Sequence, residues 1–241
     1  RDDASLDVET MVDTLRSTKG RSYSACPSVA DWERAFGEDD DVLAFTITSG
    51  LSGSFRAACA AKLNCEENSP SRRICIIDSL STGPEIVLLI EKAVSELSAG
   101  ADFDAVCRSV QDYQRRTHLI FALESLHNLA QNGRVGKLAA AAAGMLGIRA
   151  VGTTSDEGTL DLLGKCRGRK RAVDFLQEEM ERLGYTGGCV RIGHCRNTDS
   201  AGELRTAILH RFPGANIRIY PLRGLCSYYA ECGGVLVGFE A

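Results

Sequence analysis

The chain contains 241 residues, of which 44% are hydrophobic and 25% charged, a composition typical of a globular protein with enough apolar material for two modest cores. The net charge of −4 gives no basic field of the kind that neutralises nucleic-acid phosphates, which argues against a nucleic-acid-binding protein. The longest apolar runs are far shorter than the ~20 residues needed to cross a bilayer, which argues against a membrane span.

The first half of the chain alternates helical and strand patterns. In chain order they predict helices over Ser5 to Ser17 and Ser28 to Phe36, a strand over Val42 to Ile47, an alanine-rich helix that opens at residues 52–54 and runs through Leu63, a strand over Ile74 to Ile77, and helices over Pro84 to Leu97 and Phe103 to Arg115. Both strands are continuous apolar runs, typical of strands buried on two faces. We therefore predict a Rossmann-like α/β domain with a parallel sheet, spanning residues 1–116.

The second half changes character, because its strands tend to be joined by turns. Strands are predicted over His118 to Leu123, Ala150 to Thr154, Thr159 to Gly164, Cys189 to Gly193, Asn216 to Tyr220 and Val235 to Phe239. Helices are predicted over Leu126 to Asn132, Lys137 to Leu146, Arg171 to Leu183 and Ser200 to Phe212. A hairpin turn is expected at residues 156–158. This pattern predicts an α+β domain with a mainly antiparallel sheet over residues 117–241.

Ten cysteines are spread through the chain, and no signal-peptide pattern accompanies them. In a small secreted protein such a number would indicate disulfides, whereas scattered cysteines in a chain of this length are typical of reduced thiols. No C-x-x-C pair or other zinc-ligand spacing is present, so we predict no metal site. We expect the thiols to pack as small apolar side chains and the protein to be cytoplasmic.

The most informative local feature is the run from Thr48 to Ser54, which reads Thr-Ser-Gly-Leu-Ser-Gly-Ser between a predicted strand and a predicted helix. The first amides of a helix have no internal partners and lie at the positive end of its dipole, and serine hydroxyls add further donors. The run also lies where open α/β sheets usually bind ligands. It fits an anion-binding turn and equally a plain helix start in which Ser52 only caps the helix.

A serine hydrolase is a third interpretation of the same turn. Gly50-Leu51-Ser52-Gly53-Ser54 comes close to the G-x-S-x-G nucleophile elbow, but Ser54 occupies the position of the final glycine. A hydrolase would also need a histidine and an acidic residue near Ser52. The candidate histidines, none in a recognisable motif, are His118, His127, His194 and His210.

Two further polar segments are less specific. Ser24 lies in a turn from Ser22 to Ser28, which by itself indicates only a capped helix start. A basic run from Lys165 to Arg171 includes Arg167 and Arg169. Such a run commonly forms a solvated face at a helix start, and it can alternatively dock an acidic partner or steer a phosphate.

Five short segments form a series over nearly the whole chain. They are Ser24 to Ser28 (S-A-C-P-S), Ile47 to Ser54 (I-T-S-G-L-S-G-S), Ile77 to Ser81 (I-D-S-L-S), Gly133 to Val135 (G-R-V) and Leu146 to Ala150 (L-G-I-R-A). In order and spacing they resemble the T-S-x-P-S, I-S-S-x-L-S-G-T, I-D-S-x-S, G-R-I and L-x-I-x-P segments of the DegV family. The better-understood members of that family are the FakB-type fatty acid-binding subunits of a bacterial fatty acid kinase.

The resemblance implies two domains that enclose a long-chain fatty acid in an apolar tunnel and hold its carboxylate with hydroxyl and amide donors. A buried carboxylate needs hydrogen-bond donors, whereas an acyl tail needs only apolar walls. A tunnel with one polar end and an apolar remainder therefore suits a fatty acid. Ser24 takes the place of a family threonine that binds the carboxylate. The residues that take the place of the serine-rich loop are Thr48, Ser49, Ser52, Gly53 and Ser54.

The resemblance also implies that this chain needs no cofactor and performs no catalysis. A separate ATP-dependent kinase would phosphorylate the bound carboxylate, and the acyl phosphate would enter phospholipid synthesis. Arg167 and Arg169 lie in a run similar to a basic segment that contacts the kinase, so they are the candidate partner contacts.

The sequence departs from the family pattern at two places. The family's T-H-T-G-P-G segment supplies a histidine near the head group, but the matching stretch from Tyr228 to Gly234 contains none. Tyr229 falls approximately in its place and could donate through its hydroxyl. Family members also begin with a strand that ends in a D-S-x-x-D-L turn, which is not found here, so we expect the chain to lack roughly that first strand.

Three functions follow, in order of preference. The first is a fatty acid carrier that serves a kinase, the second is a lipid-binding sensor or scaffold without phosphotransfer, and the third is a serine hydrolase. Co-purified lipid would favour the first two, and covalent labelling of Ser52 would favour the third.

Overall fold

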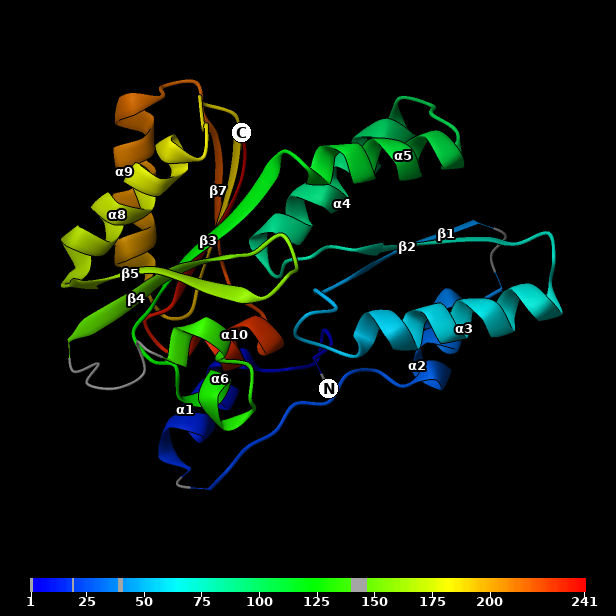
Figure 1. Cartoon of the computed structure of the whole chain (residues 1–241), viewed down its shortest axis with the longest axis horizontal. Coiled ribbons are helices and arrows are strands. Elements are labelled where there is room, and N and C mark those ends of the chain that lie inside the picture. The colour runs from blue at the N-terminus through cyan, green and yellow to red at the C-terminus, as the bar shows by residue number, and fades with distance from the viewer. Residues whose placement is uncertain (1, 19, 39–40, 140–146) are drawn as a thin grey trace.

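The structure is a computed structural model that describes residues 2–18, 20–38, 41–139 and 147–241. It contains a parallel pair of strands and a six-stranded, mainly antiparallel sheet, with helices packed on both (Figure 1). The predicted combination of a parallel unit and a mainly antiparallel unit is confirmed at this level, and the chain has a mixed α/β fold.

The parallel unit comes from the first half of the chain. Its elements are β1 (Asp41–Thr46), β2 (Arg73–Asp78), α2 (Val29–Phe36), α3 (Ser54–Asn68), α4 (Pro84–Ser98) and α5 (Phe103–Gln114). Successive side chains of a strand point to opposite faces, so both strands bury apolar residues on two sides. Leu43 and Ile77 pack with α4 and α5, whereas Ala44 and Ile74 pack with α2 and α3. This is the two-sided cover that continuous apolar strands predict.

The second unit has the strand order β5-β4-β3-β8-β6-β7, and only β6 and β7 run parallel to each other. Its strands are β3 (Thr117–Leu123), β4 (Ile148–Thr154), β5 (Leu160–Arg167), β6 (Cys189–His194), β7 (Asn216–Pro221) and β8 (Val235–Glu240). One face packs on α8 (Arg169–Arg182) and α9 (Thr198–Arg211). The other face packs on shorter helices, namely α1 (Val8–Ser17), α6 (His127–Gln131) and α10 (Gly224–Ala230).

Several element boundaries differ from the sequence-based expectation. The predicted hairpin turn is confirmed, because the Gly158 amide donates to the Ser155 carbonyl at 2.8 Å between antiparallel β4 and β5. Strand β5 continues to Arg167, beyond the predicted end at Gly164, so part of the basic run is strand, and α8 begins at Arg169, two residues before the predicted start. The helix α10 has no counterpart among the predicted elements. Of the helix predicted over Lys137 to Leu146, residues 140–146 lie outside the described residues, and residues 136–138 form a 3-10 turn.

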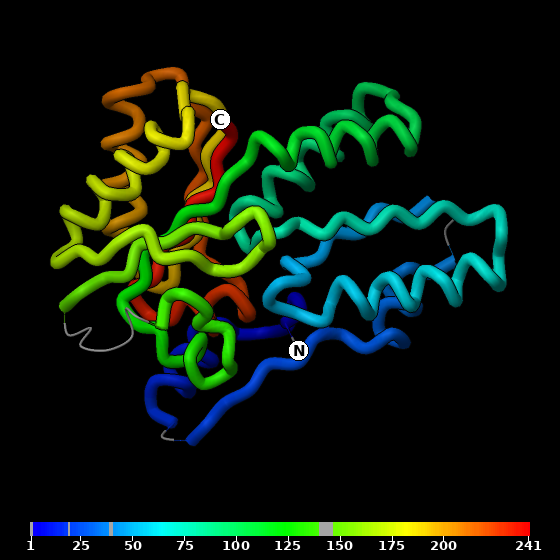
Figure 2. Tube along the Cα trace, in the orientation of Figure 1, coloured from blue at the N-terminus to red at the C-terminus, as the bar shows by residue number. Residues whose placement is uncertain are grey.

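Helix α1 lies beside the second unit although it precedes the first in sequence. It packs against α10, and Arg196 of the second unit donates to the Glu9 carboxylate at 2.6 Å. The extended segment 20–28 then leads from α1 across to α2, so the chain passes from one unit to the other (Figure 2). Strand β3 begins at Thr117, and the division into domains at residue 116 stays a prediction.

All ten cysteines are free thiols. Within the described ranges, no helix has both the length and the apolar character that a membrane crossing requires.

Glu85, near the start of α4, is a buried carboxyl group with 4% of its surface exposed. Its Oε1 accepts a hydrogen bond from the Thr117 hydroxyl at 2.7 Å, but burial outweighs this bond and raises the pKa of the carboxyl. An unfolded glutamate titrates near ~4.3, so above that pH the folded protein holds a proton that the unfolded chain releases. The stability contributed by this group is therefore lost as the pH rises through the folded pKa.

Glu85→Gln is expected to be more stable than wild type at about pH 8, and to lose much of that advantage at about pH 4, because glutamine does not titrate. Urea denaturation at both pH values measures the two differences in the free energy of unfolding. The same difference at both pH values would contradict the assignment.

Candidate ligand-binding cavity

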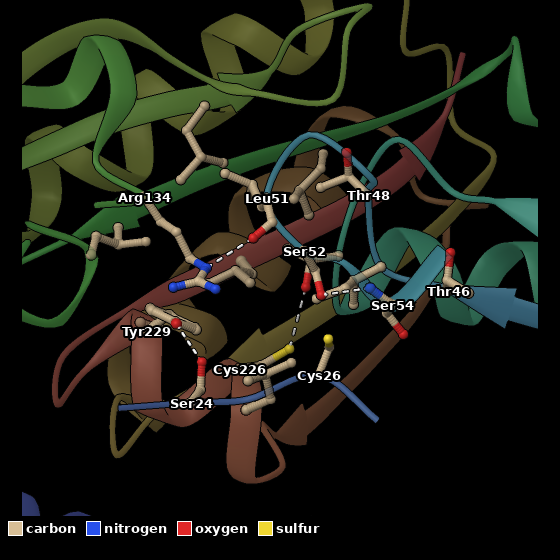
Figure 3. Close-up of a pocket in the computed structure, with 18 of the residues that line it drawn as sticks. Ser24, Cys26, Thr46, Thr48, Leu51, Ser52, Ser54, Arg134, Cys226 and Tyr229 are labelled. Atoms are coloured by element: carbon tan, nitrogen blue, oxygen red, sulfur yellow. Dashed lines mark hydrogen bonds between the residues drawn. The ribbon is translucent and has the colours of Figure 1, made fainter. Parts of the chain in front are cut away.

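A cavity of about 310 Å³ is lined by residues of both units. This volume is at the lower end of the range usual for small-molecule sites, ~300 to 1,000 Å³. Much of its apolar wall comes from the second unit, namely Leu119, Phe121, Leu123, Leu129, Leu160 and Leu236. Its polar lining residues gather near the turn at 48–54, and several of them are labelled in Figure 3. The cavity therefore joins an apolar wall to a polar end.

Thr48 ties the turn of the first unit to the second unit. Its hydroxyl donates to the Gly158 carbonyl at 2.8 Å and accepts from the Gly50 amide at 3.0 Å. A Cβ on Gly158 would lie 1.9 Å from the Thr48 hydroxyl oxygen, and Gly158 has a φ of +73°, so this contact requires glycine. Thr48 lines the cavity, but its only hydroxyl proton is already used.

The other residues of the turn divide into two groups. Ser52 and Ser54 line the cavity, and the Ser52 hydroxyl accepts from the Ser54 amide at 3.1 Å. Ser49 and Gly53 are not among the lining residues, and the Ser49 amide donates to the Asp78 carboxylate at 3.0 Å. The open part of the predicted anion-binding turn therefore consists of Ser52 and Ser54.

Ser24 and Tyr229 meet across the cavity although 205 positions separate them in sequence. Their hydroxyl oxygens are 2.6 Å apart (Figure 3). Next to them, the Tyr228 hydroxyl lies 2.8 Å from the Ser22 hydroxyl and accepts a hydrogen bond from the side-chain amide of Asn132 at 3.0 Å. These contacts fix the segment around Ser24 against α10, so the two predicted hydroxyl donors lie together.

Arg134 is the only charged side chain among the described residues that line the cavity. Its Nε donates to the Leu51 carbonyl at 2.8 Å and its Nη1 to the Asn132 carbonyl at 3.0 Å. Its guanidinium carbon lies 5.7 Å from the centre of the Tyr229 ring. A guanidinium is charged at every physiological pH, so Arg134 supplies a fixed positive charge beside the paired hydroxyl groups.

Sequence reasoning placed Arg134 in a G-R-V turn but did not assign it to the site. The only sequence signal was an arginine directly after a glycine at the end of a predicted helix. This signal is weak, because the sequence does not show which residues the arginine side chain contacts. Trp32 and Thr46 also line the cavity and were not predicted. The candidate partner residues Arg167 and Arg169 are exposed and are not among the lining residues. Arg169 pairs with Asp199 at 2.7 Å and with Glu203 at 2.9 Å.

The hydrolase hypothesis needs a base next to Ser52. None of the four histidines is among the described lining residues of the cavity, and the Ser52 hydroxyl is bound to the Ser54 amide. His194, the most buried of them, receives a hydrogen bond from the Asn197 amide at 3.3 Å. No geometry among the described residues therefore favours nucleophilic catalysis by Ser52.

The helix that carries Tyr229 is capped from the other end of the chain. Asp2 accepts hydrogen bonds from the Gly224 amide at 3.1 Å and from the Leu225 amide at 2.7 Å. These are the first amides of α10, whose own N-cap residue, Arg223, provides no side-chain bond. Asp2 therefore supplies the missing cap, and its negative charge lies at the positive end of the helix.

Asp2→Ala is expected to lower the free energy of unfolding by about 1 kcal/mol, because α10 loses its cap. Asp2→Asn should lose less, since the amide oxygen still accepts a hydrogen bond. Urea denaturation of the two variants and wild type measures the order. If asparagine and alanine destabilise equally, the capping role of Asp2 is wrong.

Known proteins share this fold and much of this sequence. The DegV family model, described as an uncharacterised protein of that family, matches residues 1–240. A DegV domain-containing protein of Streptococcus pneumoniae is 43% identical over 239 residues, which are 99% of this chain and 85% of the relative.

Two solved structures are similar over the same length. The fatty acid kinase (Fak) B3 protein of S. pneumoniae, loaded with linoleic acid, is 43% identical with a TM-score of 0.96 and matches 99% of this chain and 85% of that chain. A DegV family protein of Eubacterium eligens, loaded with heptadecanoic acid, is 42% identical with a TM-score of 0.95 and matches 100% of this chain and 87% of that chain. The chain therefore belongs to the DegV family.

Proposed function

We propose that this protein binds one long-chain fatty acid in the cavity and presents its carboxylate to a separate kinase. The observation that carries the proposal is a single cavity that joins an apolar wall to a group of hydroxyl donors and one arginine. Two relatives more than 40% identical are described as loaded with linoleic acid and heptadecanoic acid, which supports a ligand of the same class.

The two ends of the cavity suit the two ends of a fatty acid. Burial of an acyl tail is worth about 0.8 kcal/mol per methylene, so an apolar wall favours long chains over short ones. A buried carboxylate is stable only with paired donors. We assign this role to Ser24, Ser52 and Tyr229, with the charge of Arg134 beside them.

In this proposal the remaining predicted site residues shape or position the turn and do not bind the carboxylate. Thr48 holds the turn against Gly158, whereas Ser49 and Gly53 shape it without lining the cavity. Ser54 lies at the same end as Ser52, at the start of α3.

Presentation to a kinase rests on the relative described as a fatty acid kinase B3 protein. The candidate contacts are Arg167 and Arg169, which are exposed at the junction of β5 and α8. Because Arg169 is paired with Asp199 and Glu203, an acidic partner would have to exchange with these carboxylates. The side of the kinase that docks here should therefore be acidic.

Organic extraction of the purified protein followed by mass spectrometry tests lipid binding directly. We expect an acyl acid to be released and a long-chain fatty acid to rebind to the stripped protein. A protein that releases no acyl acid and rebinds none is not a fatty acid carrier. Lipid binding without phosphotransfer in the presence of the kinase would favour the sensor or scaffold.

The head-group assignment has its own test. Ser24→Ala together with Ser52→Ala is expected to weaken fatty acid binding at least tenfold, because a hydrogen bond to a charged group is worth roughly 1.5 to 3 kcal/mol. Titration calorimetry with stripped protein measures the change, and Ser109→Ala, which loses a hydroxyl bound to Glu96 on α4, is the control. Unchanged affinity of the double variant would refute the assignment.

A further inference from the structure

The extended segment of residues 20–27, which we call the strap, forms a thin part of the cavity wall. The strap runs between α1 and α2 (Figure 2). Four of its residues line the cavity, namely Ser24, Ala25, Cys26 and Pro27. Three of these four, Ala25, Cys26 and Pro27, are also exposed to solvent. A single stretch of chain therefore separates this part of the cavity from water.

The strap has little backbone support. In the described part of the chain, no backbone-to-backbone hydrogen bond joins residues 20–27 to any other residue. The neighbouring turn at 48–54, by contrast, is anchored by the Thr48 amide, which donates to the Ser81 carbonyl at 2.8 Å. Segments with solvent-exposed backbone and few buried contacts open at lower cost than paired strands and helices. The strap is therefore a part of the wall that opens easily.

The hydrogen bonds that hold the strap all involve side chains. Arg21 donates from Nη2 to the Gln131 carbonyl at 2.5 Å. The Ser22 hydroxyl lies 2.8 Å from the Tyr228 hydroxyl, and the Ser22 carbonyl accepts from the side-chain amide of Asn132 at 3.3 Å. None of Arg21, Ser22 and Tyr228 is among the described lining residues, and we call these three residues the latch. The latch holds the strap without facing the cavity.

The inner side of the strap carries a polar group. Ser24 lines the cavity and meets Tyr229 there (Figure 3), whereas the apolar wall is formed by residues such as Leu119 and Leu123. A fatty acid that enters tail first keeps its carboxylate in water until the donors receive it. Burial of an unpaired charge is avoided in this order of events. An opening at the strap therefore suits entry of the tail first.

We propose that the strap is the gate through which the acyl tail enters and leaves, and that it closes over the carboxylate through Ser24. The inference rests on the proposed function and specifies the route of its ligand. The latch is broken each time the gate opens, in the empty protein and in the filled protein alike. Because the latch does not line the cavity, it controls the rates of entry and release and not the affinity.

The double variant Arg21→Gln with Tyr228→Phe tests the gate. Phenylalanine keeps the ring that contacts the Tyr229 ring at 4.8 Å between centroids and removes only the hydroxyl. Stopped-flow fluorescence of stripped full-length chain with cis-parinaric acid, a fluorescent polyene fatty acid, measures entry, and a chase with palmitate measures release. Both rates are expected to rise about fivefold or more, with less than about a twofold change in the dissociation constant, because the lost bonds stabilise the closed strap equally with and without ligand.

The control is Arg16→Gln with Tyr185→Phe, which removes the same charge and the same kind of hydroxyl away from the strap. Arg16 is exposed near the end of α1, and the Tyr185 hydroxyl donates to the Gly188 carbonyl at 3.0 Å. This variant should change neither rate. Unchanged rates in the latch variant would mean that the tail passes elsewhere. Faster release with unchanged entry would mean that the latch stabilises the bound state, and either result overturns the gate. Arg21→Gln alone replaces the double variant if the latter folds poorly.

Limited proteolysis tests whether the ligand closes the strap. Tyr23 is 69% exposed and lies between the latch residue Ser22 and the cavity residue Ser24. Chymotrypsin should cut after Tyr23 when the strap opens, and saturating palmitate should slow this cut at least roughly threefold, because cleavage follows the population of the open form. Mass spectrometry of the fragments identifies the bond. Equal cleavage with and without palmitate contradicts closure through Ser24, whereas failure of wild type to bind either fatty acid overturns the proposed function instead.

Discussion

Arg134→Gln is expected to weaken binding of a long-chain fatty acid by as much as about a hundredfold. Arg134 is the only charged group among the described lining residues, and a hydrogen bond to a charged group contributes up to ~3 kcal/mol. The variant also loses the bonds that hold the Leu51 carbonyl and the Asn132 carbonyl, so the polar end of the cavity becomes less ordered. Titration calorimetry of stripped protein with palmitate measures the loss.

Lys137→Gln is the matched control for this prediction. Lys137 lies three residues further along the chain, is 72% exposed and pairs with Asp161 at 2.9 Å outside the cavity lining. Its loss removes the same charge from the same segment without touching the site. A similar drop in affinity for both variants would show that net charge, rather than the position of Arg134, controls binding.

Glu91→Ala is expected to lower the free energy of unfolding by about 3 to 5 kcal/mol, because it leaves a buried arginine without its carboxylate. Arg191 of β6 has a side chain that is only 3% exposed, and its Nε and Nη2 donate to the Glu91 carboxylate at 2.9 Å and 2.5 Å. Arg218 of β7 donates to the same carboxylate at 3.0 Å. This cluster joins α4 of the first unit to the sheet of the second.

Urea denaturation measures this loss, and Glu178→Ala serves as the comparison. Glu178 pairs with Arg171 at 2.8 Å, but the two side chains are 59% and 54% exposed. An exposed pair contributes at most about 1 kcal/mol, so its removal should be nearly neutral. If both variants lose the same stability, the Glu91 cluster does not hold the two units together.

The strands and most helices could be predicted because each pattern is local. The apolar runs of β1 and β2 specify burial on two faces, and the turn at 156–158 specifies the β4 to β5 hairpin. Helix α10 could not be predicted in this way. Its segment begins with glycine and contains cysteine, serine and two tyrosines, which are weak helix formers, and its cap is Asp2, 222 positions away.

The residues of the candidate site also fall into those that a local pattern predicts and those that only distant contacts place. Ser52 and Ser54 were predicted because a glycine- and serine-rich turn before a helix is a local anion-binding pattern. The place of Arg134 depends on a contact with Leu51, 83 positions away, and nothing in the G-R-V turn specifies that partner. Trp32 lines the cavity from α2, and no pattern in that helix marks it as a lining residue. Local patterns therefore locate the turn but not the donors that converge on it.

Because both units supply the cavity wall, the occupant of the cavity and the relative orientation of the two sheets are coupled. Rotation of one unit against the other would alter the shape of the space around the tail. If the proposed function holds, a partner that binds either unit from outside would distinguish the filled protein from the empty one and could speed release without contacting the ligand. The coupling is reciprocal: whatever favours the filled arrangement must also tighten the hold on the ligand to the same extent.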